Sequence, residues 1–257
     1  MADRLSTAPV PALPGRFQGA ILVGQVDDAA DHGDAMTLRD AWETRAADWV
    51  RWARSPALDN DFWDFHLPEF LRFVPDPGRL TVDVGCGEGR LGRVLAAAGH
   101  QLVGFDASPT SARAAATHPD AHPVAIADAV RLPLPDATAD LAVAFMSLHD
   151  FDDLPAAVTE VARVLTPDGR FCAALLHPAL TARLVDGYAT ERRYSFTVEN
   201  GGLQMTYEGI HRPLAAYFTA LEAAGFVVES LREPVAVRDD GASSVTFLHV
   251  RGRLPAR

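Results

Sequence analysis

Three carboxylates stand at or near the ends of successive apolar runs, a placement suited to binding a ligand. Asp83 lies inside the run 80–84, Asp106 follows the run 101–105, and Asp128 follows the run 124–127. If these runs are neighbouring parallel strands, their carboxyl ends share the edge where α/β sheets bind ligands. A carboxylate after the second strand can accept hydrogen bonds from both ribose hydroxyls. Asp128 with Ala129 is suited to hydrogen-bonding an adenine amino group, so the sequence predicts a nucleoside site.

A glycine-rich turn follows the first of these runs. Gly85, Gly87 and Gly89 form the pattern Gly-x-Gly-x-Gly just before a predicted helix, and they allow the backbone to approach a ligand closely. The dinucleotide fingerprint Gly-x-Gly-x-x-Gly would need glycine where Arg90 stands. The turn therefore favours a nucleoside other than NAD.

The elements that must position these residues alternate between strand and helix, the pattern of a parallel sheet with crossover helices. Strands are predicted at 80–84, 101–105, 124–127, 140–146 and 170–176, and helices at 90–98, 108–117 and 154–165. A further helix at 214–224 is followed by strands at 226–231 and 244–250. The predicted class is therefore α/β, with a doubly wound sheet.

The remaining segments divide the chain around that core. Residues 1–36 are predicted to be mostly irregular, and 37–257 to form one domain. Within it, 37–76 holds all four tryptophans in amphipathic helices and is predicted to be a helical lid, and 78–176 is the ligand-binding core. Residues 177–213 form an insertion after the fifth strand whose alternation around Asn200-Gly-Gly predicts a β-hairpin, and 214–257 is the closing helix with its strands.

Composition excludes several classes of function. All 23 basic residues are arginine, so there is no lysine for a Walker phosphate loop, a kinase strand or a pyridoxal Schiff base. The net charge of −11 disfavours nucleic acid as a partner and favours a small molecule. No apolar stretch near the start suggests a leader or a membrane span. With two cysteines outside any metal-ligand spacing, we expect a cytoplasmic chain.

Four motifs together resemble the class I S-adenosylmethionine (SAM)-dependent methyltransferases of the small-molecule type. They are VDVGCGEG, GFDAS, IADAVRLPLPDATADLAVAFMSLHDFDD and AVTEVARVLTPDGRF. The resemblance implies a Rossmann-like, mostly parallel seven-stranded sheet with an antiparallel last strand, and SAM as cofactor. It assigns cofactor contacts to Gly85, Cys86, Gly87, Asp106, Ala107, Asp128, Ala129, Met146 and Ser147, beside the strand-end carboxylate Asp83.

An oxygen acceptor, or a protonated nitrogen, must lose a proton during methyl transfer, and histidine is the natural base. His149 follows the fourth strand, His177 ends the fifth, and His211 stands at the exit of the insertion, so these three are the catalytic candidates. A magnesium site would need carboxylates after both the fourth and fifth strands, and His177-Pro178 occupies the second place, so no metal is predicted. Arg51 and Arg54 are candidates to pair with a carboxylate of the cofactor or acceptor.

Several alternatives stay open. The favoured hypothesis is methyl transfer to an oxygen of a specialised metabolite. Others are N- or C-methylation, a SAM-binding enzyme of the same fold that transfers no methyl group, such as a cyclase, and a SAM-binding regulator. An NAD-dependent dehydrogenase is disfavoured by Arg90 and by the missing lysine. The acceptor and the oligomeric state, with a homodimer as one option, stay open.

Overall fold

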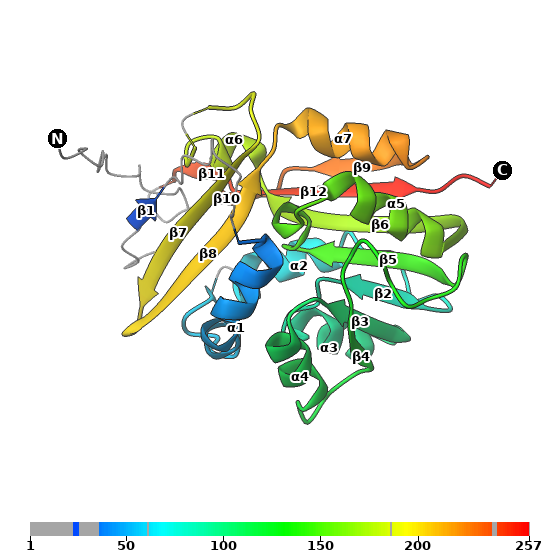
Figure 1. Cartoon of the computed structure of the whole chain (residues 1–257), viewed down its shortest axis with the longest axis horizontal. Helices are drawn as coiled ribbons and strands as arrows, with labels where there is room; N and C mark the ends of the chain where they lie inside the picture. The colour runs from blue at the N-terminus through cyan, green and yellow to red at the C-terminus, as the bar shows by residue number, and fades with distance from the viewer. Residues whose placement is uncertain (1–22, 26–35, 61, 186, 238–240, 257) are drawn as a thin grey trace.

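A seven-stranded sheet forms the centre of the chain in the computed structural model, which describes residues 23–25, 36–60, 62–185, 187–237 and 241–256. Its strand order is β4-β3-β2-β5-β6-β12-β9. The bounds in that order are β4 (Val124–Ile126), β3 (Leu102–Asp106), β2 (Thr81–Val84), β5 (Ala139–Phe145), β6 (Leu165–Leu176), β12 (Phe247–Arg253) and β9 (Val227–Arg232). Strand β12 is antiparallel to both of its neighbours, whereas β2 to β6 pair in parallel. The predicted Rossmann-like, mostly parallel sheet is confirmed (Figure 1).

The two faces of the sheet are covered by different helices because side chains alternate along each strand. One face packs against α5 (Leu154–Val164) and α7 (Leu214–Ala223). The other packs against α3 (Arg90–Ala97), the one-turn π-helix η1 (Phe62–His66) and α2 (Leu67–Leu71). Strand β5 shows the alternation directly: Ala142 and Ala144 lie in the first core, and Leu141, Val143 and Phe145 lie in the second.

Helix α4 (Pro109–Ala116) follows β3, and the 3-10 turn η2 (Leu148–Asp150) follows β5. The short α6 (Pro178–Thr181) follows β6. Strands β10 (Val235–Val237) and β11 (Ser243–Val245) pair with each other, so the predicted strand 244–250 is divided between β11 and β12. The predicted strand 170–176 begins earlier, at Leu165, which pairs with Ala139.

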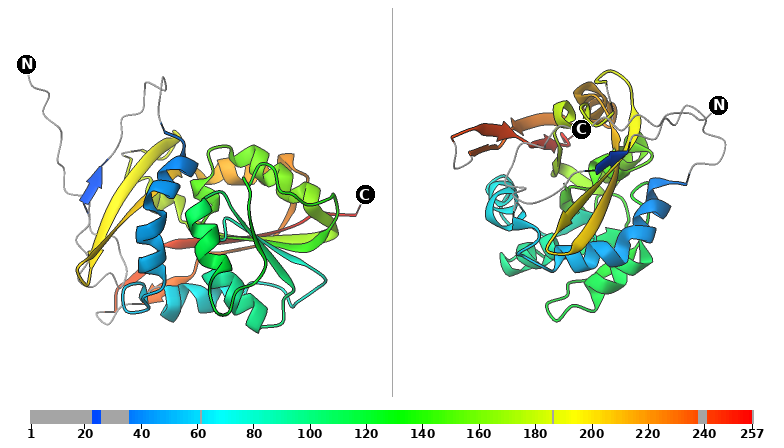
Figure 2. Two further views of the ribbon diagram at one scale, coloured as in Figure 1. Left: turned by 60° about the horizontal axis from the view of Figure 1, so that its bottom comes forward. Right: turned by 90° about the vertical axis from the view of Figure 1, so that its left-hand side faces the viewer.

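A third layer covers the carboxyl ends of the parallel strands. It consists of α1 (Leu38–Ala53) and the antiparallel hairpin of β7 (Arg192–Asn200) and β8 (Leu203–His211). In Figures 1 and 2 α1 lies between this hairpin and the body of the sheet. Trp52 of α1 and Tyr194, Phe196 and Met205 of the hairpin share a separate apolar cluster. Strand β1 (Val23–Gln25) pairs with β7, so the segment predicted to be irregular contributes one short strand, while 1–22 and 26–35 lie outside the described residues.

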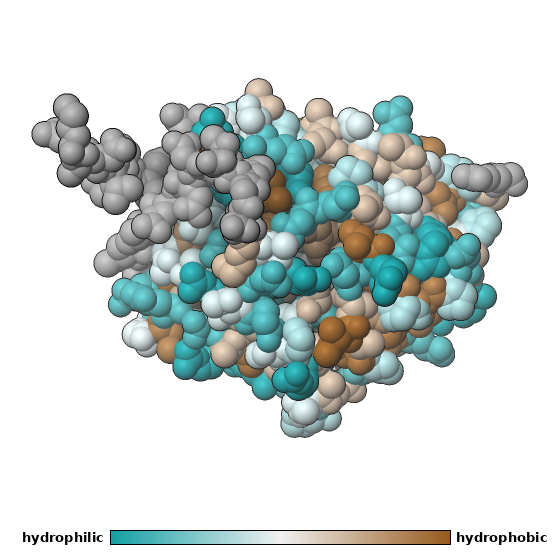
Figure 3. Space-filling model, viewed as in Figure 1, coloured by the Kyte–Doolittle hydropathy of each residue, from teal (hydrophilic) through white to brown (hydrophobic). Residues whose placement is uncertain are grey.

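The surface agrees with this division between core and exterior. On the face seen in Figure 3, hydrophobic side chains form small separate patches among hydrophilic ones. Most of the buried apolar side chains belong to the three internal clusters. No helix in the described part of the chain is long and apolar enough to cross a membrane.

Candidate functional site

A pocket of about 440 Å³ lies between the carboxyl ends of the parallel strands and the covering layer. This volume is in the range of small-molecule sites. The structure brings all ten predicted cofactor residues to its wall: Asp83, Gly85, Cys86, Gly87, Asp106, Ala107, Asp128, Ala129, Met146 and Ser147. The common edge of the parallel strands explains why positions so far apart in the sequence meet here.

The glycine turn is held open by its own backbone and by the next strand. Gly85, Gly87 and Gly89 all have positive φ angles, which side chains other than glycine rarely adopt. The Gly87 amide donates to Asp106 Oδ2 at 2.7 Å. A Cβ atom added to Gly87 would lie 3.1 Å from Nε1 of Trp49, so a side chain here would crowd the indole and strain the backbone.

The second carboxylate oxygen of Asp106 is also engaged, because it accepts the Ser108 amide at 2.8 Å. These two bonds fix the carboxyl group at the end of β3, where each oxygen keeps a lone pair for a ligand hydroxyl. Burial raises the pKa of Asp106, and its two backbone hydrogen bonds oppose that shift. Asp128 is more exposed and lies 3.7 Å from Arg39 of α1.

Asp83 shares with Glu88 the lowest exposure among the carboxyl groups of the pocket wall. It is 1% exposed, and its Oδ2 has no hydrogen-bond partner among the described residues. Burial, together with the nearby Asp106, raises the pKa of Asp83 to about 7. A cationic ligand would relieve both effects, since a positive charge favours the ionised carboxylate.

We therefore expect the binding of SAM, a cation, to depend on pH through Asp83. Below pH 7 the free protein holds a proton on Asp83, so binding must release it and the affinity falls as the pH is lowered. Above pH 7 the carboxylate is already ionised and the affinity levels off. Isothermal titration in two buffers of different ionisation enthalpy, at pH 5.5 and pH 8, measures the released proton. Asp83→Asn should abolish the pH dependence, and an unchanged dependence in that variant would exclude Asp83 as its source.

Helix α1 lies along this pocket and is fastened to the sheet at several points. Its amino end is bound by Asp152, whose carboxylate accepts the Leu38 amide at 3.0 Å. In the middle, Glu43 accepts hydrogen bonds from the Ser108 and Thr110 hydroxyls at the start of α4. Toward its end, Arg54 pairs with Glu88 at 3.0 Å. The helix thus covers the pocket from the Asp128 side to the glycine turn.

The hairpin completes the cover with aromatic side chains. Trp49 of α1 is in edge contact with Trp42, at 6.1 Å between ring centroids, and with Tyr207 of β8, at 6.2 Å. Tyr207 in turn stacks on Phe196 of β7 at 5.0 Å. All four rings line the pocket and form the part of its wall that faces away from the sheet.

If this cover opens to admit ligand, its backbone amides should exchange hydrogen more slowly once ligand is bound. At a ligand concentration 100 times the Kd, binding adds about 2.7 kcal/mol to any opening that releases the ligand, so exchange can slow by up to about 100-fold. Exchange followed by mass spectrometry, with and without S-adenosylhomocysteine, should show this in α1 and in β7–β8. Helix α7, on the far face of the sheet core, is the internal control. Equal exchange of α1 in both states would show that α1 is a fixed wall.

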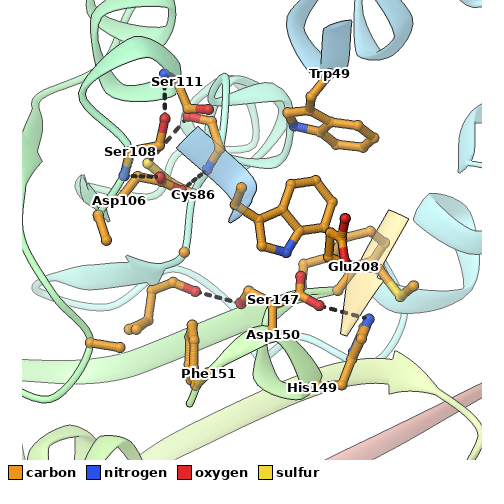
Figure 4. Close-up of a pocket in the computed structure, with 18 of the residues that line it drawn as sticks. Trp49, Cys86, Asp106, Ser108, Ser111, Ser147, His149, Asp150, Phe151 and Glu208 are labelled. Carbon is orange, nitrogen blue, oxygen red and sulfur yellow. Dashed lines mark hydrogen bonds and ion pairs between the residues drawn. The ribbon is translucent and has the colours of Figure 1, made fainter. Parts of the chain in front are cut away.

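The turn after β5 has an unusual backbone. Met146 has a φ of 59°, in the left-handed region where strain is expected for a residue of its size. The next residue, Ser147, is anchored by its hydroxyl, which donates to the Val84 carbonyl at 2.7 Å. The turn directs the chain into η2 and brings His149 and Asp150 to the pocket wall (Figure 4).

The structure separates the three histidines that the sequence offered as bases. Of these three candidates, only His149 lines the pocket. Nδ1 of His177 accepts the Ala179 amide at the start of α6, and its Nε2 lies 2.7 Å from Glu233. His211 is fully buried, with Nε2 donating to the Tyr188 carbonyl and Nδ1 facing the Thr181 hydroxyl. Both ring nitrogens of His177 and of His211 are thus occupied by the fold.

His149 and Asp150 form a buried pair. Nε2 of His149 lies 3.6 Å from Oδ1 of Asp150, and the two side chains are 6% and 15% exposed. Burial, with the nearby Arg212, lowers the pKa of His149 to about 3. Burial moves the pKa of Asp150 in the opposite direction, well above its ordinary value. The same dry environment therefore weakens His149 as a base and strengthens Asp150.

Other pocket residues were not predicted from the sequence to contact a ligand. Arg90 is held by Asp59 and lies over the Phe62 ring, 3.5 Å from its centroid. Arg90 and Arg39 reach the pocket, whereas Arg51 is exposed and pairs with Asp48, and Arg54 pairs with Glu88. Trp42, His66, Tyr194 and Glu208 also line the pocket. Their only sequence signal was the aromatic and polar content of the two covering segments.

Comparison with known proteins agrees with this geometry. Residues 82–173 match the family model described as "Methyltransferase domain". A curated malonyl-[acyl-carrier protein] O-methyltransferase of Serratia marcescens is 33% identical over 93 residues, which are 36% of each chain. A ubiquinone/menaquinone biosynthesis C-methyltransferase of Caulobacter vibrioides is 29% identical over 60% of this chain and 70% of its own. The chain spans 36% to 42% of the length of three curated relatives that it matches, the Serratia marcescens enzyme among them.

Among solved structures, a SAM-dependent methyltransferase from Mesorhizobium loti superimposes with a TM-score of 0.56 and 25% identity, covering 72% of this chain and 96% of that one. Residues 82–173 therefore carry a methyltransferase domain, and the sheet has the fold of the class I SAM-dependent methyltransferases, whose cofactor is SAM. The site fits a cationic nucleoside, because Asp83 has an unpartnered buried oxygen and Gly87 provides a cradle that a Cβ would fill. Among the described residues, no three His, Cys, Asp or Glu side chains are grouped to hold a metal ion.

Proposed function

We propose that this chain transfers the methyl group of SAM to a hydroxyl oxygen of a small, largely apolar acceptor, a specialised metabolite. The observation that carries the proposal is the His149–Asp150 pair, buried in the same pocket as the predicted cofactor residues. The pair supplies a group that can take a proton at the wall of the ligand pocket.

The remaining wall of the pocket supports an apolar acceptor. Beyond the turn after β5, the lining includes Leu176, Leu180, Phe196 and Phe247. Burying such an acceptor stabilises the complex by about 25 cal/mol for each Å² of apolar surface removed from water. The covering hairpin would then exclude water from the acceptor and hold its hydroxyl in place.

When bound, SAM supplies an electrophilic methyl group on a cationic sulfur. The task of the protein is then mainly orientation, which can account for much of the rate. The hydroxyl must also lose a proton, and we assign this proton to the carboxylate of Asp150. His149, neutral above its lowered pKa of about 3, lies beside that carboxylate, with its Nε2 3.6 Å from Oδ1 of Asp150.

The proposal is tested by incubating the protein with SAM that carries a trideuterated methyl group. The acceptors would be a panel of phenols, aliphatic alcohols, amines and compounds with an acidic C–H bond. A product heavier by one trideuteromethyl group on oxygen, matched by S-adenosylhomocysteine, is the expected result. Label on nitrogen or carbon would overturn the oxygen assignment and keep the transferase. SAM binding without any S-adenosylhomocysteine across the panel would favour an enzyme of this fold that transfers no methyl group, such as a cyclase.

A further inference from the structure

A pair of buried histidines lies at the pocket and is used neither by the sequence motifs nor by the proposed proton transfer. His66 ends the π-helix η1, is 2% exposed and lines the pocket. π-helices of this length are rare and often occur at functional sites. The His66 ring stacks on Phe247, with 3.6 Å between centroids and 9° between planes, and lies 4.4 Å from Phe145.

The position of His66 separates it from the nucleoside end of the pocket. Phe145 ends β5 and Phe247 begins β12, beside the carboxyl end of β6. The residues predicted to hold ribose and adenine follow β3 and β4, toward the opposite edge of the sheet. His66 therefore lies on the side where the lining is apolar and the acceptor is expected.

The partner of His66 is His249, which is fully buried in β12. The two Nε2 atoms are 3.1 Å apart, so one of them must carry hydrogen and donate to the other. The pKa of each ring is lowered, mainly by burial and further by neighbouring cationic groups that include Arg90 for His66 and Arg232 for His249. Both rings are thus neutral near pH 7, and each carries a single N–H.

The surroundings of His249 decide which nitrogen donates. Its Nδ1 is buried without a hydrogen-bond partner among the described residues. If His66 donated, His249 would have to keep its own hydrogen on this orphaned Nδ1, and buried N–H groups without an acceptor are rare. If His249 donates instead, its Nδ1 is only an unused lone pair. The hydrogen of His66 then lies on Nδ1, the nitrogen left for the pocket.

We propose that His66 donates its Nδ1–H to an electronegative atom of the methyl acceptor, a carbonyl or similar oxygen distinct from the methylated hydroxyl. This assignment rests on the proposed function, since it takes the molecule bound at the apolar side of the pocket to be the acceptor. His249 fixes the tautomer and so acts as a positioning residue. The acceptor class becomes an apolar hydroxyl compound that also carries a hydrogen-bond-accepting oxygen.

The tautomer can be measured without any substrate. Long-range ¹H–¹⁵N correlation of histidine-labelled protein with bound S-adenosylhomocysteine distinguishes the two neutral tautomers, and His66→Phe and His249→Gln assign the signals. At pH 7 we expect hydrogen on Nδ1 of His66 and on Nε2 of His249. Hydrogen on Nε2 of His66 would overturn the proposal.

Donation to a ligand is tested with acetophenone and α-methylstyrene, which share a shape but differ in C=O against C=CH2. In the S-adenosylhomocysteine complex we expect acetophenone to bind about three- to tenfold tighter, the size of one net hydrogen bond, and to shift the His66 Nδ1 signal. His66→Phe should lose the preference, whereas His118→Gln, at a distant surface histidine, should keep it. The absence of a preference in the wild type, or its persistence in His66→Phe, would overturn the proposal.

The same variant separates this inference from the proposed function. A tenfold or larger loss of S-adenosylhomocysteine affinity in His66→Phe would place His66 at the cofactor instead and overturn the inference alone. If the wild type transfers a methyl group but His66 shows neither the tautomer nor the preference, the proposed function stands without it. If the wild type fails to bind S-adenosylhomocysteine, the proposed function fails whatever the tautomer. Should His66→Phe not fold, the wild-type tautomer and the probe-induced shift still decide.

Discussion

Replacing Asp150 by Asn is expected to lower the rate of methyl transfer by about 10²- to 10⁴-fold, the usual contribution of a positioned base. The amide keeps the size of the carboxyl group and cannot take a proton. Affinity for S-adenosylhomocysteine should stay within about twofold, because the proposed function assigns Asp150 to the acceptor and not to the cofactor. Single-turnover rates against one confirmed hydroxyl substrate, with the affinity measured by calorimetry, separate the two effects.

His149→Gln should lower the same rate in the same direction, because His149 is the immediate neighbour of the carboxylate. His177→Gln and His211→Gln are the matched controls and should leave the rate per folded molecule unchanged, since neither residue lines the pocket. A rate that falls in a control and not in Asp150→Asn would contradict the assignment of the base.

The pH profile gives a further readout of this pair. The active form holds Asp150 ionised, so the rate should rise with pH through the raised pKa of that carboxyl group. His149 contributes no step between pH 5 and 9, because its lowered pKa of about 3 keeps it neutral there. In Asp150→Asn the rise should vanish. A rise that persists in this variant would assign the proton to another group.

Asp106→Ala is expected to weaken SAM binding by about 1.5–3 kcal/mol for each hydrogen bond to the ribose that it removes, which is more than tenfold in Kd. The carboxylate also accepts the Gly87 and Ser108 amides, so its removal loosens the glycine turn as well. Calorimetric titration with S-adenosylhomocysteine measures the effect, and circular dichroism checks the fold.

Two variants control this experiment. Asp106→Asn retains the shape of the side chain and one acceptor oxygen, so it should lose less affinity than Asp106→Ala. Asp120→Ala removes an equal charge at an exposed position, with 84% of the side chain accessible, and should have no effect. Unchanged affinity in a folded Asp106→Ala protein would remove Asp106 from the cofactor site.

The part of the pocket wall that we assign to the cofactor could be predicted from sequence because its residues sit at the ends of strands. Apolar runs identify the strands, and the parallel arrangement brings their carboxyl ends to one edge, so Asp83, Asp106 and Ser147 meet without further information. The sheet itself was predictable for the same reason. The alternation of strand and helix left few ways to arrange it.

The acceptor side depends on contacts between distant segments, and local patterns do not encode them. His66 precedes its partner His249 by most of the length of the chain, and only the folded sheet brings their rings together. The place of His177 at a strand end predicted it as a catalytic base. The sequence did not show that its Nδ1 caps the next helix and that its Nε2 contacts Glu233. Burial decides the roles of His149 and Asp150 as well, because it reverses which of the two is the better base.

The central claim, that the strand-end pocket binds SAM for methyl transfer, is tested most directly by calorimetric titration of the purified chain with SAM, with NAD as the comparison ligand. We predict one molecule of SAM per chain, bound more weakly below pH 7, and no measurable binding of NAD. Binding of NAD in preference to SAM, or no binding of SAM at pH 8, would contradict the account.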